Sequence, residues 1–198
     1  MKYILFGLFS LVLLAGCGQN ATPPEKHSFN ATDITGVPWG KDFSLTDQTG
    51  HARSLKDFRG KVVAMFFGYT HCPDVCPTTL SEFALALKLM GKDAERVQVL
   101  FITVDPERDT PALLAQYVPA FNPRFLGLYT DVTSLPKLAA DYKVVYQKSA
   151  GSSPQDYLID HSAGTYVYDP QGRLRLLVPY GSKPKAIAED LIALLQGH

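Results

Sequence analysis

The sequence has no excess of charge of either sign, because 19 lysine and arginine residues are matched by 19 aspartate and glutamate residues. Such a balance creates no overall field toward nucleic acid or an anionic lipid surface, so we expect no nucleic-acid partner. After the first 16 residues, no apolar run approaches the length that spans a bilayer. The chain also shows no internal repeat and has only three cysteines. What remains is the composition of an ordinary globular domain.

The first 16 residues are predicted to be a lipoprotein signal peptide. Lys2 supplies a basic start, and the apolar run from Ile4 to Ala15 is too short to span a bilayer comfortably. It ends in Leu-Ala-Gly-Cys17, which resembles the bacterial lipobox. We therefore expect an exported protein that is anchored to a membrane through lipidated Cys17 and faces the periplasm or another extracytoplasmic space. The alternative is an ordinary secretory signal followed by a chance cysteine.

Removal of the signal peptide leaves 198 − 16 = 182 residues, which is enough for one domain with a substantial core. Residues 17–40 are polar, contain Pro23, Pro24 and Pro38, and show no apolar period, so they are predicted to form a flexible tether. The folded domain is expected to comprise residues 41–198.

A buried strand followed by a helix organises this domain. Residues 62–67 are continuously apolar, which is typical of a strand buried on both faces. Apolar residues then recur at helical spacing from Leu80 to Leu87, and Pro77 suits the first helical position. Cys72 and Cys76 are therefore expected in the loop between strand and helix. The positive end of the helix favours the thiolate form of both.

The remaining elements alternate in type. We expect a hairpin within residues 43–58 beside the core strand, and an exposed loop or insertion at 147–156. Helices are predicted from the Thr110 cap to Pro119, from 133 or 134 to 142, and from Pro184 onward. Strands are predicted at 97–104, 125–129, 165–168 and 174–178. This order is typical of an α/β, thioredoxin-like domain with a central mixed sheet flanked by helices and an N-terminal β-hairpin.

The Cys72–Cys76 pair permits more than one interpretation. An exported protein could join the two in a structural disulfide. However, so short a loop would contribute only about 2 kcal/mol, which a domain of this size hardly needs. A functional role is therefore favoured. Two thiolates with one imidazole suit copper(I), whereas a structural zinc site completed by His71 or Asp74 is an alternative.

The chain offers five candidate imidazoles: His27, His51, His71, His161 and His198. His71 adjoins Cys72, but neighbouring side chains diverge in extended backbone. His161 is predicted on a loop just before the strand at 165–168, and in a thioredoxin-like sheet that loop lies over the cysteine loop. From spacing alone, His161 is either a ligand or a hydrogen-bonded surface histidine.

Three segments together resemble the signatures of the SCO/SenC family. They are FGYTHCPDVCPTTL at 67–80, VDPERDTP at 104–111 and DHSA at 160–163. Their order and spacing match those of the family, and the resemblance covers about residues 36 to 196. The family comprises membrane-tethered, thioredoxin-like copper-binding proteins that help to assemble the CuA centre of cytochrome c oxidase.

The resemblance implies that copper is bound by Cys72, Cys76 and His161. It also implies a metallochaperone rather than an enzyme, with the CuA-bearing subunit of cytochrome c oxidase as its partner and a periplasmic copper donor or thiol reductant as further partners. Asp160 is a candidate to support the histidine. The charged residues of the second segment, Asp105, Glu107, Arg108 and Asp109, are candidates for a partner-facing patch.

Two other functions use the same thiols. A thiol–disulfide oxidoreductase typically has two residues between its cysteines and a cis-proline before the facing strand, whereas here Pro73, Asp74 and Val75 intervene and His161–Gly164 contains no proline. A peroxiredoxin-type peroxidase places threonine three residues before the reactive cysteine, where this chain has Pro73 or Tyr69. The oxidoreductase remains the main alternative, and it is compatible with copper binding, which requires reduced thiols.

Overall fold

The computed structural model describes residues 27–153 and 156–198. The expected signal peptide and Cys17 lie outside these residues. The sheet has eight strands in the order β1-β10-β9-β4-β5-β6-β2-β3, and β7 and β8 form a separate pair. The strands are β1 (Thr32–Asp33), β2 (Leu45–Asp47), β3 (Ala52–Arg53), β4 (Val62–Gly68), β5 (Val97–Thr103), β6 (Leu126–Tyr129), β7 (Tyr146–Ser153), β8 (Asp156–His161), β9 (Thr165–Tyr168) and β10 (Leu174–Val178).

Strand β4 lies at the centre of this sheet. It runs parallel to β5 and antiparallel to β9, and all seven of its residues are buried. Continuous burial explains the unbroken apolar run, because both faces of a central strand need apolar side chains. The predicted mixed sheet of an α/β fold is confirmed.

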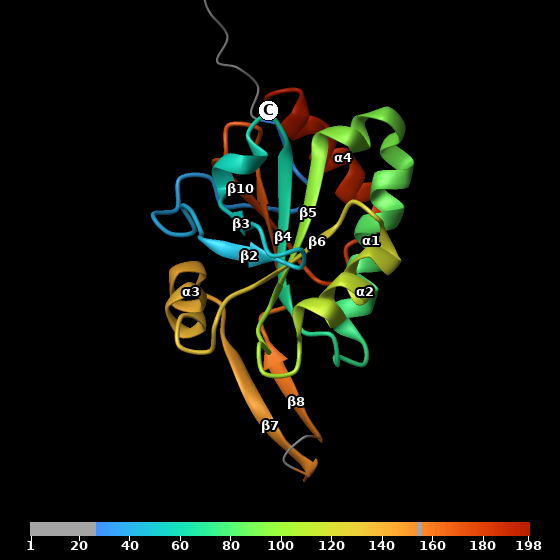
Figure 1. The fold of residues 1–198 in the computed structure, drawn as a ribbon. Helices are drawn as coiled ribbons and strands as arrows, with labels where there is room; N and C mark the ends of the chain where they lie inside the picture. The colour runs from blue at the N-terminus through green and yellow to red at the C-terminus, as the bar shows by residue number, and fades with distance from the viewer. Residues whose placement is uncertain (1–26, 154–155) are drawn as a thin grey trace, which may run out of the picture.

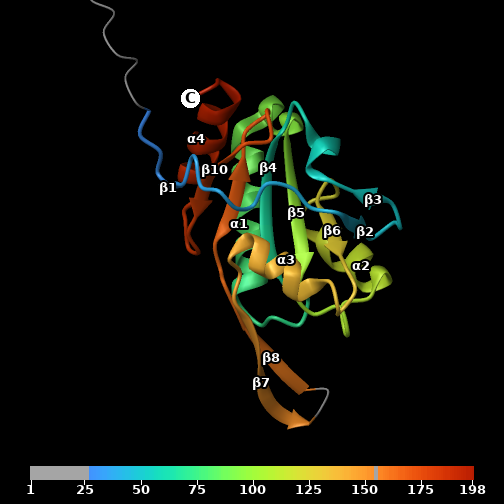
Figure 2. The same ribbon diagram turned by 90° about the vertical axis from the view of Figure 1, so that its left-hand side faces the viewer.

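Helices cover both faces of the sheet. In Figures 1 and 2, α1, α2 and α4 lie on one face and α3 lies on the other. The helical segments are η1 (Leu55–Phe58), α1 (Val75–Met90), η2 (Gly91–Arg96), α2 (Pro111–Phe121), α3 (Leu135–Tyr142) and α4 (Pro184–Leu195). Thr110 caps α2 through a hydrogen bond that its side chain accepts from the Leu113 N–H. This capping agrees with the sequence-based expectation.

Two predicted helix ends were wrong. Helix α1 begins at Val75, so Cys76 is its second residue and Pro77 its third. Both positions belong to the first turn, where the N–H groups have no helical partner and proline is tolerated. Helix α2 continues through Pro119 to Phe121. The ring of Pro119 removes one hydrogen bond in the last turns of the helix, and the helix ends soon afterward.

Two predictions about hairpins were also wrong. The expected hairpin at 43–58 exists as β2 and β3, but β2 pairs with β6 at the edge of the sheet rather than with the core strand. The expected exposed loop at 147–156 instead lies largely in the β7–β8 hairpin, which projects from the lower end in Figure 1. Strand β7 is polar and contains Gly151, so this segment lacks the apolar alternation from which a hairpin is predicted.

Residues before position 41, where the domain was expected to start, already pair with the rest of the fold. Strand β1 pairs with β10, and the Asp190 carboxylate accepts hydrogen bonds from the backbone N–H groups of Asn30 and Ala31. A segment too polar to show an apolar period is therefore held by backbone pairing and by one buried carboxylate. The expectation of a flexible tether is wrong for this part of residues 17–40.

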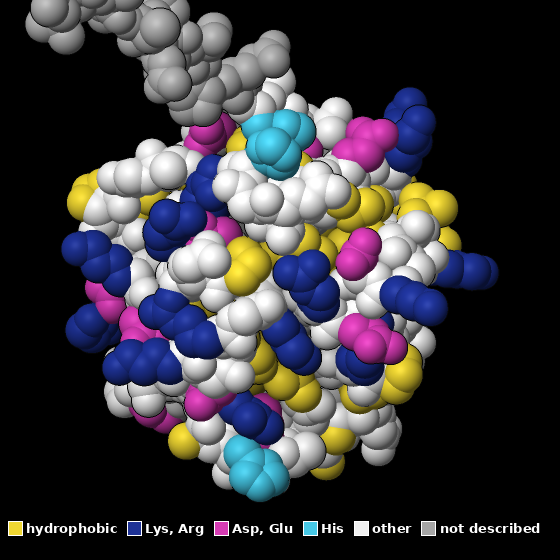
Figure 3. Space-filling model, turned by 90° about the horizontal axis from the view of Figure 1, so that it is seen from above, with side chains coloured by type: hydrophobic (Ala, Val, Ile, Leu, Met, Phe, Trp, Pro, Cys, Tyr) yellow, Lys and Arg dark blue, Asp and Glu magenta, His cyan; other side chains and the backbone are white. Residues whose placement is uncertain are grey.

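The end of the molecule opposite the β7–β8 hairpin carries both ends of the described chain, where the rings of His27 and His198 stack 4.6 Å apart. Figure 3 shows lysine and arginine side chains interspersed with acidic ones on this end. No helix within residues 27–153 and 156–198 is long and apolar enough to cross a bilayer.

Candidate metal centre

Cys72 lies in the loop that leaves the carboxyl end of β4. A turn shapes this loop, because the Cys72 N–H donates to the carbonyl oxygen of Tyr69. The Cys72 side chain is half-buried, whereas Cys76 in the first turn of α1 is fully buried. The loop therefore carries a partly accessible thiol at Cys72, and the helix carries an enclosed thiol at Cys76. Neither thiol is in a disulfide.

Gly68 makes room for the enclosed thiol. A Cβ atom at this position would lie 2.8 Å from the Cys76 Sγ atom and 2.8 Å from a ring carbon of Phe66. Real Cβ atoms do not approach other atoms so closely, so any larger residue would displace the sulfur or the aromatic core. The glycine at the end of β4 is thus required by packing beneath the site.

His161 enters the site from a different part of the fold. It is the last residue of β8, rather than part of a loop as predicted, and its Nε2 atom lies 3.4 Å from the Sγ atom of Cys76. Its Nδ1 atom lies 3.0 Å from the carbonyl oxygen of Ser162. Because a carbonyl only accepts hydrogen bonds, this contact keeps the proton on Nδ1 and leaves the Nε2 lone pair facing the sulfurs.

The two thiols differ in acidity. A hydrogen bond from the Cys76 thiol lowers the pKa of Cys72 to about 4, with help from backbone N–H groups of Asp74 and Cys76 and against the effect of burial. The same hydrogen bond, together with burial, raises the pKa of Cys76. At neutral pH, Cys72 is therefore the thiolate and Cys76 carries the proton.

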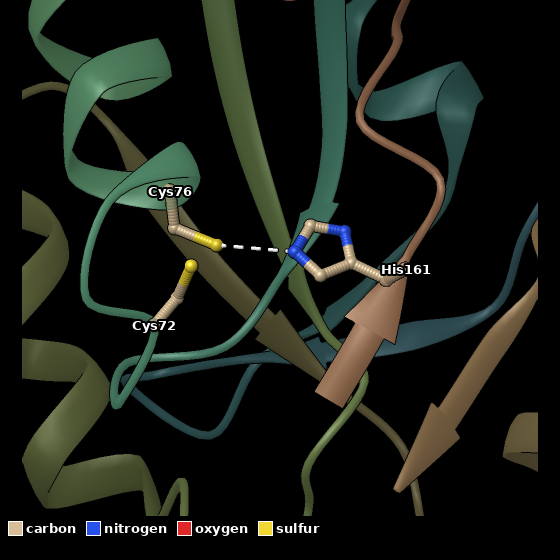
Figure 4. Close-up of side chains that lie close together, drawn as sticks. All are labelled: Cys72, Cys76 and His161. Atoms are coloured by element: carbon tan, nitrogen blue, oxygen red, sulfur yellow. Dashed lines mark hydrogen bonds between the residues drawn. The ribbon is translucent and has the colours of Figure 1, made fainter. Parts of the chain in front are cut away.

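The ligand atoms of Cys72, Cys76 and His161 all lie within 4.8 Å of one another, and in the described part of the chain they form the one such group of three. Figure 4 shows the three side chains pointing toward a common point from a loop, a helix and a strand. Two thiolates and one imidazole form a soft donor set of low coordination number, which suits copper(I).

Comparison with known proteins identifies the family. The SCO1/SenC family model matches residues 32–196, which include all three of these side chains. The chain belongs to the SCO1/SenC family. It is 40% identical over 159 residues to the mitochondrial SCO2 homolog of Bos taurus and 33% identical over 191 residues to a SCO2-like protein of Rickettsia felis.

The alignments differ in how much of each relative they cover. They include 79% of this chain but 58% of the bovine protein, compared with 95% of this chain and 91% of the Rickettsia protein. The chain therefore spans about three fifths of the length of the mitochondrial relative. Among solved structures, copper-bound ScoI of Bradyrhizobium japonicum is 43% identical, with a TM-score of 0.72 over 79% of this chain and 99% of that one.

Other histidines of this SCO1/SenC protein lie away from the three donors. The His71 side chain is 47% exposed and its Nδ1 atom lies 3.7 Å from the Asp109 carboxylate, rather than near the sulfurs. His51 hydrogen-bonds to Thr49 in the β2–β3 turn. His27 and His198 stack at the other end of the molecule. The structure thus brings one of the five candidate imidazoles to the cysteine pair.

The expected patch of four charged residues is not a surface patch. Asp105 and Asp109 are 1% and 2% exposed. Asp109 accepts hydrogen bonds from Thr103 and from the side chain and backbone of Thr70, although burial raises its pKa. Arg108 is largely covered, with 16% of its side chain exposed, and of the four only Glu107 is exposed. Through the hydrogen bonds between Asp109 and Thr70, this segment joins the loop that follows β5 to the loop that follows β4.

Asp160 does not support His161. Its carboxylate accepts a hydrogen bond from Ser149 across the hairpin, and the Nδ1 atom of His161 instead contacts the carbonyl of Ser162. Residue 160 is adjacent to His161 in a strand, so its side chain points to the opposite face. Sequence reasoning also missed the role of Tyr69, whose ring forms a T-shaped pair with the His161 ring, with the two centroids 5.9 Å apart. No local pattern around Tyr69 signals this contact.

Proposed function

We propose that the protein is a membrane-tethered copper chaperone that binds copper(I) through Cys72, Cys76 and His161. We further propose that it assists assembly of the CuA centre of cytochrome c oxidase, with the CuA-bearing subunit as its partner. A periplasmic copper donor or a thiol reductant would act before it.

One observation carries the metal-binding part of this proposal. Three donors on three separate elements converge within 4.8 Å of one another, although His161 is 85 residues from Cys76. A surface histidine without such a role would not need its Nε2 atom directed at a buried thiol. The half-exposed Cys72 gives a metal a path to and from the solvent, as transfer to a partner requires.

Family membership supports the identity of the metal and the process. The related ScoI of Bradyrhizobium japonicum has a structure with copper bound. The order of the three signature segments resembles that of proteins that assemble the CuA centre. The proposed anchor is lipidated Cys17, which would keep the domain at a membrane surface outside the cytoplasm.

Metal analysis of the full chain in two thiol states tests the proposal. The reduced protein should bind one equivalent of copper(I), and the air-oxidised protein almost none, because copper(I) needs both thiolates. Equal binding in both states would mean that the cysteine pair is not the site. A stoichiometric zinc complex without preference for copper would instead favour a structural metal site.

Thiol–disulfide exchange is the second candidate function, and the acidity of Cys72 favours it. A half-exposed thiolate beside a buried thiol is the arrangement of an attacking cysteine and its resolving partner. Such a reaction needs the two sulfurs and a proton acceptor, whereas copper binding also needs His161. Substitution of His161 therefore separates the two functions.

A further inference from the structure

His161 is carried by an element outside the main sheet. Strand β8 pairs with β7 in a hairpin of two strands, while both cysteines follow the central strand β4. The hydrogen bonds of the main sheet therefore do not fix the third donor relative to the two sulfurs. Its position depends on contacts between the hairpin and the loops next to the site.

The first of these contacts joins Tyr157 of the hairpin to Arg108 and Asp105. The Arg108 Nη1 atom donates to the carbonyl oxygen of Tyr157 at 2.9 Å, and the guanidinium carbon lies 3.6 Å from the centroid of the Tyr157 ring. The Tyr157 hydroxyl donates to Asp105 at 2.7 Å, and Asp105 also accepts from the Arg108 Nε atom at 2.5 Å. The three side chains thus form a closed ring of contacts.

Tyr69 makes the second contact two residues further along β8. Its hydroxyl accepts a hydrogen bond of 3.1 Å from the Ile159 N–H, and it is 2% exposed. Arg108 also borders this tyrosine, since its guanidinium carbon lies 5.9 Å from the centroid of the Tyr69 ring. Ile159 itself is buried among the core side chains.

The side chains of Tyr157 and Ile159 lie on the same face of the strand as the candidate ligand. Side chains alternate along a strand, so residues 157, 159 and 161 point to the same side of β8. Contacts with the rest of the domain fix β8 at Tyr157 and at Ile159. His161 is the next residue on the same face of the strand. A displacement of the strand at Tyr157 would therefore move the imidazole away from the sulfurs while leaving the β4–α1 loop in place.

We propose that Arg108 is a positioning residue for His161, and that its hydrogen bond to Tyr157 and its stacking on the Tyr157 ring fix the distance between the imidazole and the cysteine pair. This inference rests on the proposed metal site. Lysine cannot replace arginine here, because only a planar guanidinium can stack on the tyrosine ring while donating hydrogen bonds to two different acceptors.

A double-mutant cycle with copper(I) as the probe tests the proposal. Arg108→Lys should weaken copper(I) binding by about 10- to 100-fold, the range found when residues that orient a metal ligand are changed. In a His161→Ala background the same change should alter affinity by less than about twofold, because its effect passes through the imidazole. Equal losses in both backgrounds, or no loss in either, would overturn the proposal.

Two further variants serve as a matched control and as a replacement for a variant that does not fold. Arg173→Lys makes the same chemical change at an arginine that is paired with Asp169 at 2.7 Å in the β9–β10 turn, and should leave copper affinity unchanged. If Arg108→Lys fails to fold, Tyr157→Phe removes only the hydroxyl bonded to Asp105 and should show the same dependence on His161.

The metal-free protein distinguishes failure of this inference from failure of the copper proposal. Exchange of the Ile159 amide hydrogen should be at least about tenfold faster in Arg108→Lys than in the wild type, because the strand opens locally. The NMR signals of the His161 ring should shift as well. If the wild type binds no copper(I), the copper proposal fails, while unchanged exchange and unchanged ring signals in Arg108→Lys overturn the positioning role on their own.

Discussion

The Nε2 atom of His161 lies 3.4 Å from the Sγ atom of Cys76, although 85 residues separate the two in the chain. The Ser162 carbonyl holds the ring in the orientation that directs the Nε2 lone pair at the sulfur. The buried sulfur and the imidazole are thus placed where both can contact one metal ion.

Replacement of His161 by alanine should weaken copper(I) binding by more than about 100-fold, since changes to groups that merely orient a ligand already cost 10- to 100-fold. The variant should still form and break the Cys72–Cys76 disulfide, because both sulfurs remain. Competition with a chromophoric copper(I) chelator measures the affinity, and thiol labelling after redox cycling measures the disulfide.

His71→Ala is the matched control for this experiment, because His71 adjoins Cys72 but lies at the Asp109 carboxylate. It should leave the affinity unchanged. Wild-type copper affinity in His161→Ala would remove the histidine from the site. If Cys72→Ser then also lost reductase activity toward a partner disulfide, the protein would be a thiol–disulfide oxidoreductase.

Copper(I) binding should release about one proton above neutral pH. The lowered pKa of Cys72, about 4, means that its thiolate is present above that pH and is lost only as the pH falls through it. The raised pKa of Cys76 means that its proton is still bound and must leave with metal binding. The apparent Kd should therefore fall about tenfold per pH unit between about pH 7 and 9.

Chelator competition at several pH values measures this slope. A hundredfold change per unit would mean that both cysteines are protonated in the free protein, and a flat profile would mean that neither loses a proton on binding. Cys76→Ser should bind copper(I) weakly and without the tenfold slope, because the proton source is gone.

Gly68→Ala should destabilise the fold by about 1–3 kcal/mol, the usual effect of overpacking a filled core. The new methyl group would collide with the Cys76 sulfur and with the rings of Phe66 and Phe101 at 2.8 to 2.9 Å. Urea unfolding measures the free energy, and copper affinity should fall in parallel.

Gly164→Ala is the comparison for this variant, because the atoms nearest to its added methyl group belong to the flexible Leu177 side chain, with Cδ1 at 2.7 Å, rather than to a packed ring or a buried sulfur. It should destabilise the fold much less. Equal effects of the two substitutions would contradict a special requirement for glycine beneath Cys76.

Cys17→Ala should abolish the proposed lipid anchor. If Cys17 carries the lipid, the variant should either keep its signal peptide or appear in the soluble fraction after detergent-free fractionation of cells. Mass spectrometry of the mature chain provides the second measurement. An unchanged mature mass together with unchanged membrane association would contradict the anchor.

Local sequence patterns predicted the elements that form the centre of the fold. The apolar run before Gly68 predicted a buried central strand, and Thr110 with Pro111 predicted the start of α2, because burial and capping leave marks within a few residues. The β7–β8 hairpin was missed because most of β7 is polar and shows no apolar alternation, although Ile159 of β8 packs into the core. The pairing of β2 with β6 was missed because β6 lies about 80 residues further along the chain, and no local pattern records a partner so distant.

The sequence by itself determined which residues can bind a soft metal, since two cysteines four positions apart at the start of a helix must lie close together. Spacing left His161 open as either a ligand or a surface histidine, and resemblance to a family supplied its role. Only the tertiary structure decided that the imidazole reaches Cys76, that the Ser162 carbonyl rather than Asp160 holds it, and that Asp105 and Asp109 are buried. These relationships join residues on separate elements, and no local preference of the chain encodes the distance between them.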